Sequence, residues 1–358
     1  MPAEVYRRLC ETMANRGGRY PGKDIPEFYT LAEELFTPDE AAVSNAMPRG
    51  ASSAAAIAQA MGRGEGEVKA ILEGMADKGL CSTLRRDGEQ LYLAPPFVPG
   101  IFEYVFMRGT RTDRDRQLAK LIHAYEVAMD TQGGPPKAAF PTSRVIPVEQ
   151  KIAAGSRVHT YDQVAKYIEE SDPISVATCY CRHQAELIDE TDTCGKPNDV
   201  CMQFGKGAEF LIERKIGRSI TKEEARDILK RSEDAGLVHL TLNAQEIDFI
   251  CNCCADHCMA LKTALAHPKP ALFLTSGFQP VFDSDTCVAC ETCVDACPAT
   301  ALSMGDEEVP EVDLDRCFGC GVCATICPVE AVEMVGKADA AVPPPDRKAL
   351  AAAVKAQA

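Results

Sequence analysis

Near its C-terminus the chain repeats a run of four cysteines and a proline at identical spacing. The two copies are CVACETCVDACP, from Cys287 to Pro298, and CFGCGVCATICP, from Cys317 to Pro328. Three cysteines spaced by two residues can hold three corners of one iron–sulfur cube in a tight loop. In runs of this kind the fourth cysteine, just before the proline, reaches the other cube. The repeat therefore predicts two 4Fe–4S clusters whose ligands interleave.

Exchange of the fourth cysteine defines the two predicted ligand sets. Cluster 1 is expected to take Cys287, Cys290, Cys293 and Cys327, and cluster 2 is expected to take Cys317, Cys320, Cys323 and Cys297. A pair of zinc knuckles is the alternative. Structural zinc sites typically use four ligands in two pairs, and a repeated four-cysteine run that ends in proline does not follow that pattern.

The same residues carry a family resemblance. Residues 283–335 resemble a bacterial-type ferredoxin with two 4Fe–4S clusters, because all eight cysteines and both prolines match. The resemblance implies a ββαββα-like fold of pseudo-twofold symmetry and one-electron transfer at low potential. The stretch SMGDEEVPEVDLD is longer than in the most compact ferredoxins and alters a connecting loop. More loosely, residues 160–335 resemble multi-cluster iron–sulfur proteins of anaerobes, which implies no particular reaction.

Eight further cysteines lie in the middle of the chain and could hold two more clusters, up to four in total. They are Cys179, Cys181, Cys194 and Cys201, followed by Cys251, Cys253, Cys254 and Cys258. One grouping keeps each local quartet together. A second grouping places Cys-x-Cys at the ends of the β-rich runs PISVATCYC and EIDFICNCC, so that both sulfurs of each pair share one strand face and the two pairs converge. Adjacent Cys253 and Cys254 diverge on a strand, which favours separate sites.

Other interpretations of the middle cysteines remain open. One is a structural zinc with spare thiols, and another is a set of inert buried cysteines, since free cysteine packs as a small hydrophobe. His183 and His257 adjoin ligand candidates. A lone histidine is more often a hydrogen-bonding neighbour, whereas an imidazole ligand would raise the potential of a cluster.

The predicted fold class is α+β with three domains and a tail. We expect a helical and winged-helix-like domain over 1–136, a cysteine-rich iron–sulfur domain over 137–280 and a dicluster ferredoxin domain over 281–336. In the first, two helices over 54–80 precede a hairpin that turns at Asp87-Gly88. The stretch TQGGPPKAAFPTS is typical of a linker, and the Ala- and Pro-rich segment 337–358 is predicted to be mobile.

Composition and charge indicate the cellular compartment and the class of partner to expect. The chain has neither an apolar run long enough to span a membrane nor a basic-apolar leader, so we expect a cytoplasmic protein, where thiols stay reduced. Its net charge is −15, and each bound cluster would make it more acidic. The second helix of the winged-helix-like region is itself acidic, and Arg85 and Arg86 are the local exception. A basic redox partner protein is expected, and nucleic acid is not.

These observations predict an electron-transfer protein or subunit that exchanges single electrons with a partner oxidoreductase. One alternative is a redox enzyme with a substrate-accessible cluster in the middle domain. Another is a winged-helix regulator that senses redox state. The sequence contains no Ser–His–Asp arrangement, and Cys254 to Cys258 supplies only half of the radical-forming C-x3-C-x2-C run. Whether the chain is an enzyme is left open by its sequence.

Overall fold

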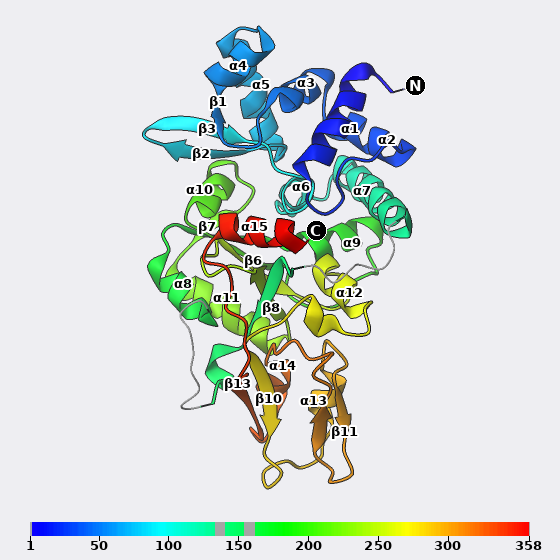
Figure 1. The fold of residues 1–358 in the computed structure, drawn as a ribbon, viewed down its shortest axis with the longest axis vertical. Coiled ribbons are helices and arrows are strands. Elements are labelled where there is room, and N and C mark those ends of the chain that lie inside the picture. Colours follow the sequence, from blue (N-terminus) through cyan, green and yellow to red (C-terminus); the bar gives the residue numbers. More distant parts are fainter. Residues whose placement is uncertain (1, 133–139, 154–161, 358) are drawn as a thin grey trace. The chain divides into compact units, whose positions relative to one another are not determined.

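The computed structural model describes residues 2–132, 140–153 and 162–357 (Figure 1). The chain divides into two compact units. Unit 1 comprises Met1–Gly134, Ala177–Thr193 and Ala208–Arg218, and unit 2 comprises Pro135–Val176, Cys194–Gly207 and Ser219–Ala358. The predicted boundary at 136/137 and most of the predicted linker lie outside the described residues. The finer division into three domains remains a prediction.

Unit 1 is mainly helical. Its helices are α1 (Glu4–Arg16), α2 (Pro26–Leu35), α3 (Pro38–Ala46), α4 (Ala54–Met61), α5 (Glu65–Lys78), α6 (Ile101–Phe106), α7 (Asp113–Gln132), α9 (Tyr180–Ile188) and most of α10 (Lys206–Glu213). Thr37 begins α3 with a capping box, in which its hydroxyl accepts from the Glu40 amide and the Glu40 carboxylate accepts from the Thr37 amide. The rings of Phe97 and Phe102 stack with centroids 4.7 Å apart in the core.

A small antiparallel sheet completes unit 1. Its strands are β1 (Ser52–Ser53), β2 (Ser82–Arg86) and β3 (Glu89–Leu93), in the order β1–β3–β2. The β2–β3 hairpin turns at Asp87 and Gly88, which have φ angles of 52° and 80°. Positive φ at both positions is what a two-residue type I′ turn requires. The two helices and the hairpin thus occupy the expected residues, and the assignment as a winged helix stays a prediction.

Unit 2 contains nearly all of a six-stranded sheet in its described residues. The strand order is β4–β8–β9–β6–β5–β7, with bounds β4 (Ser143–Ile146), β5 (Ile174–Thr178), β6 (Asp199–Phe204), β7 (Arg218–Ile220), β8 (Val238–Leu242) and β9 (Phe249–Cys253). The accompanying helices are α8 (Val164–Glu170), α11 (Lys222–Asp234), α12 (Met259–Leu265) and two short 3-10 helices, Glu149–Lys151 and Pro270–Leu272. Thr221 caps α11 by accepting from the Glu224 amide.

The cysteine repeat forms a smaller β-α-β-β-α-β part of unit 2. Its elements are β10 (Phe278–Phe282), α13 (Thr292–Asp295), β11 (Leu302–Met304), β12 (Pro310–Val312), α14 (Val322–Ile326) and β13 (Val332–Gly336). Strand β10 pairs with β13 and β11 pairs with β12, both antiparallel (Figure 1). The expected order was ββαββα, and the observed order differs because each half begins with one strand and not two.

The C-terminal segment, for which we predicted mobility, is helical at its end, where α15 spans Arg347–Gln357. The amides of Gln245 and Glu246 donate to the carbonyls of Pro344 and Pro345, at 2.8 and 3.1 Å. The Arg347 guanidinium also pairs with the Asp248 carboxylate. Proline has no N–H donor, but its carbonyl can still accept such bonds. This segment is therefore attached to unit 2.

Candidate functional site

The two cysteine runs fold into loops of matching backbone conformation. Positive φ angles occur in pairs thirty residues apart: Ala289 with Gly319 (51° and 69°), Glu291 with Gly321 (60° and 85°), and Thr300 with Glu330 (46° and 54°). A residue other than glycine costs about 1–2 kcal/mol in this region. The loops therefore hold left-handed turns at corresponding positions whether or not glycine is present, so the two runs share a local backbone symmetry.

An apolar cavity lies between the second run and the fourth cysteine of the first. Its lining includes Cys297, Cys317, Cys320 and Cys323, together with apolar side chains such as Phe318 and Met334. The pKa of Cys320 is raised to about 12, mainly by burial and also by the charges of Cys297 and Cys317. The four sulfurs predicted for cluster 2 thus line one cavity, and the donor set suits an iron–sulfur cube.

The first run lies closer to the surface. Burial raises the pKa of Cys293, and the charges of Cys327 and Cys287 add to the shift, so the fourth cysteine of the second run lies near the first run. Cys290 is exposed. Its pKa is lowered because the Thr292 hydroxyl donates a hydrogen bond to its sulfur at 3.4 Å.

Backbone amides also approach the sulfurs of both fourth cysteines. The Ala301 amide donates to Cys297 Sγ at 3.3 Å, and the Ala331 amide donates to Cys327 Sγ at 3.2 Å. These bonds lie thirty residues apart and repeat the same geometry. Hydrogen bonds to ligand sulfurs stabilise the reduced, more negative state of a cluster, so they tune its potential.

A second group of cysteines gathers where β9 meets α12. Cys251 and Cys253 lie on β9, and Cys258 precedes α12. Hydrogen bonds with Cys251 and Cys258 raise the pKa of Cys253, and its burial adds to the shift. Cys201 lies on the neighbouring strand β6. Met202 of β6 pairs with Ile250 of β9, so the same antiparallel register, extended by one residue, places Cys201 opposite Cys251. Directly opposite residues share a face, with Cβ atoms about 4.5–5.5 Å apart.

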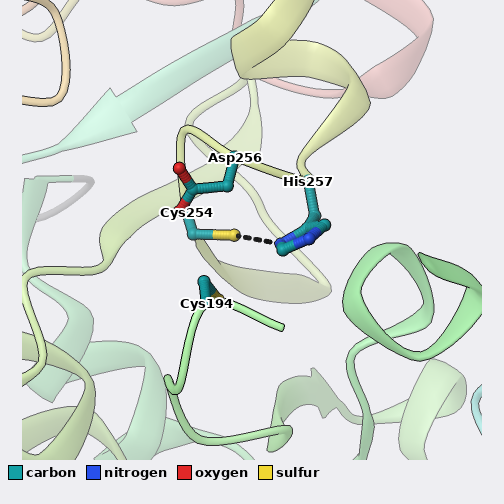
Figure 2. A group of neighbouring side chains, drawn as sticks. All are labelled: Cys194, Cys254, Asp256 and His257. Atoms are coloured by element: carbon teal, nitrogen blue, oxygen red, sulfur yellow. Dashed lines mark hydrogen bonds between the residues drawn. The ribbon is translucent and has the colours of Figure 1, made fainter. Parts of the chain in front are cut away.

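A third group includes residues of the turn that follows β9. Ligand-type atoms of Cys194, Cys254, Asp256 and His257 all lie within 4.8 Å of one another (Figure 2). Cys254 Sγ is 3.5 Å from His257 Nδ1. Cys253 and Cys254 therefore belong to different groups, as the alternation of a strand favours. Asp256 was not singled out from the sequence, and its place beside His257 in a cysteine-rich turn is the signal that could have found it.

Cys179 and Cys181 lie in unit 1, whereas the other six middle cysteines lie in unit 2. The expectation that this pair ends a strand is wrong, because β5 ends at Thr178 and α9 begins at Tyr180. The pKa of Cys179 is raised well above its usual value, first by a hydrogen bond with Cys181 and then by burial. The pair is thus adjacent at the start of a helix and does not point from one strand face.

His183 is a buried core residue of unit 1. Its Nε2 lies 2.8 Å from the Thr110 carbonyl oxygen, so the ring donates a hydrogen bond there. Its ring also meets the Phe106 ring edge-on, with centroids 6.5 Å apart. Its contacts are those of a hydrogen-bonding neighbour, whereas His257 is the histidine that lies beside a cysteine sulfur.

Comparison with known families agrees with the geometry of the repeat. Residues 280–334 match a family described as a 4Fe-4S dicluster domain. The match supports a ferredoxin-like 4Fe–4S domain near the C-terminus and an iron–sulfur electron-transfer role. It covers only this part of the chain. No curated protein matched the sequence. Among the described residues, no helix has both the length and the apolar character needed to cross a membrane.

Proposed function

We propose that this chain is a multi-cluster electron-transfer protein that passes single electrons at low potential to or from a partner oxidoreductase. Cluster 1 is held by Cys287, Cys290, Cys293 and Cys327, and cluster 2 by Cys317, Cys320, Cys323 and Cys297. The observation that carries the proposal is the cavity that joins Cys297 to the three cysteines of the other run. When bound, such clusters supply reversible one-electron chemistry.

A third centre is proposed at Cys201, Cys251, Cys253 and Cys258. Four thiolates suit a 4Fe–4S cluster, and a four-cysteine zinc site is the alternative. Apolar packing favours the cluster, because Cys251, Cys253 and Cys258 share one core with Cys297, Cys317 and Cys320. Cluster 2 also shares a separate core with cluster 1, through Cys297, Cys323, Cys293 and Cys327. The implied order is cluster 1, cluster 2, third centre.

The proposed docking surface surrounds cluster 1. Val288, which is 60 % exposed, follows Cys287, and Ile326, which is 40 % exposed, precedes Cys327. Cys290 itself is exposed. Residues 280–334 contain twelve Asp and Glu residues and one basic residue, Arg316. A partner with a small apolar contact surrounded by basic side chains fits this surface.

The regulator alternative gains no support from α5 and the hairpin. Arg63 pairs with Asp39 and Glu67. Lys78 pairs with Glu40, and Arg85 lies 3.6 Å from Glu213. These three basic side chains, which could contact phosphates in a DNA complex, are thus already paired with carboxylates. The reducing conditions that sixteen clustered cysteines need are those of the anaerobic cytoplasm, which we propose as the compartment.

Single Cys→Ser variants test the interleaved ligand sets. Purified without oxygen, the chain should carry about twelve irons and as many sulfides, four for each of three clusters. Cys297→Ser should change the EPR spectrum of the reduced protein in the same way as Cys320→Ser. It should differ from Cys290→Ser, although Cys297 and Cys290 belong to the same run.

The matched control is Cys81→Ser, because Cys81 is buried in unit 1 and donates its hydrogen bond to the Leu72 carbonyl. It should retain the iron content and spectrum of the unaltered chain. Grouping of Cys297→Ser with Cys290→Ser would contradict the interleaving. Absence of acid-labile sulfide from the unaltered chain would refute the electron-transfer function as a whole.

A further inference from the structure

The turn after β9 carries donor atoms that the iron–sulfur clusters do not use. Cys254 follows the last residue of β9, and the Cys258 amide donates to the Cys254 carbonyl at 3.2 Å, which closes the turn. His257 lies inside the turn, and its ring faces the Cys254 sulfur (Figure 2). Cys194 comes from the separate loop that precedes β6. Two segments distant in sequence therefore contribute to one group.

This group differs in chemistry from the other cysteine sets. It offers two thiols, one imidazole and one carboxylate, whereas a 4Fe–4S cluster of the ferredoxin type takes four thiolates. Two sulfurs with nitrogen and oxygen donors in four positions are typical of Zn²⁺, which is commonly tetrahedral and accepts all three ligand types. Cys254 is buried, Cys194 and His257 are half-buried, and Asp256 is exposed. Three donors are thus partly or fully shielded and the fourth faces solvent.

The distances agree with a single ion. With Zn–S of about 2.3 Å and Zn–N of about 2.0–2.1 Å, a tetrahedral angle gives an S···N separation of about 3.5 Å. The observed separation between Cys254 Sγ and His257 Nδ1 is 3.5 Å. A thiol–imidazole hydrogen bond alone would have a similar length, but it would not bring Cys194 and Asp256 to within 4.8 Å of both atoms.

We propose that Cys194, Cys254 and His257 bind one Zn²⁺ ion, with the Asp256 carboxylate as the fourth, solvent-facing ligand. The ion ties the loop before β6 to the turn after β9. Because Cys254 adjoins Cys253, and His257 adjoins Cys258, this site lies directly beside the ligands of the third centre without sharing any of them. With an iron–sulfur cluster at the third centre, as proposed above, the zinc bound by the chain reports on this site.

Metal analysis combined with zinc-edge X-ray absorption tests the site without interference from iron. The full chain, produced in zinc-supplemented medium and purified without oxygen, should contain a zinc ion whose shell has two sulfurs and two nitrogen or oxygen atoms. Cys194→Ser and His257→Gln should each lose that zinc while the iron content and the EPR spectrum of the ferredoxin-type clusters stay unchanged. His257→Cys should keep the zinc and show three sulfurs.

The matched control is His267→Gln, since His267 lies in the same unit and its Nδ1 accepts from the Lys269 amide. It should retain zinc with an unchanged shell. Three results would overturn the proposal: no zinc in the unaltered chain, a zinc shell of four sulfurs only, or loss of about four irons in Cys194→Ser. The last would assign Cys194 to an iron–sulfur cluster. An intact ferredoxin-type EPR spectrum in each variant shows that the chain has folded.

Discussion

Gly319 provides a sharp test of how the second cysteine loop is packed. Its φ is +69°, and a Cβ atom there would overlap the Phe278 carbonyl oxygen and the Ser276 hydroxyl at distances that real Cβ atoms do not show. Neither neighbour can move freely. The Ser276 hydroxyl donates to the Gly319 carbonyl at 2.7 Å, and the Phe278 amide donates to Ser276 Oγ at 3.1 Å. Gly319→Ala must therefore displace β10 or the loop that holds Cys317 and Cys320.

The cost can be compared with that of a glycine that has the same conformation but open space. Gly205 lies in the same unit with φ +53° and no atom within 4 Å of an added Cβ. Gly205→Ala should cost only the left-handed conformation, about 1–2 kcal/mol. Gly319→Ala adds an overlap of about 1–3 kcal/mol, for a total of about 2–5 kcal/mol.

Anaerobic thermal unfolding with iron analysis measures the difference. In a unit of 150–250 residues, each kcal/mol lowers the midpoint by about 2–4 °C. Gly319→Ala should therefore lower the unfolding midpoint roughly twice as much as Gly205→Ala does. It should also lose about four irons, which is the content of one cluster. Full iron content in Gly319→Ala, together with the midpoint of Gly205→Ala, would refute the packing argument.

Two further predictions address the docking surface and the C-terminal segment. Asp295→Lys reverses an exposed charge on α13 and should slow electron transfer to a basic cytochrome used as a probe. The effect should vanish at high ionic strength because salt screens exposed charges. The control Asp113→Lys, in unit 1, should have no such effect. Ending the chain after Val342 removes the hydrogen bonds to Gln245 and Glu246 and should destabilise unit 2 by about 1–4 kcal/mol, measured by thermal unfolding. An unchanged unfolding midpoint would mean that the segment contributes no stability.

The sequence was most informative where ligands are close together along the chain. Spacing by two residues, and a proline after the fourth cysteine, are local constraints that a tight loop must satisfy whatever surrounds it. The position of the ferredoxin-like part and the hairpin turn at Asp87-Gly88 were predictable for the same reason. The attachment of the C-terminal segment could not be predicted, because it depends on contacts with Gln245 and Asp248, about one hundred residues away in sequence.

The middle cysteines could not be grouped from sequence because their neighbours are set by strand register. A shift of one residue between β6 and β9 would turn Cys201 to the opposite face from Cys251, and spacing along the chain carries no trace of that choice. The end of β9 matters equally. Since the strand stops at Cys253, Cys254 enters a turn and leaves the face that Cys251 and Cys253 share. Cys181 shows the converse: once a helix begins at Tyr180, a Cys-x-Cys pair no longer follows strand alternation. Identical Cys-x-Cys patterns therefore lie in different local structures, and only the ends of the secondary-structure elements distinguish them.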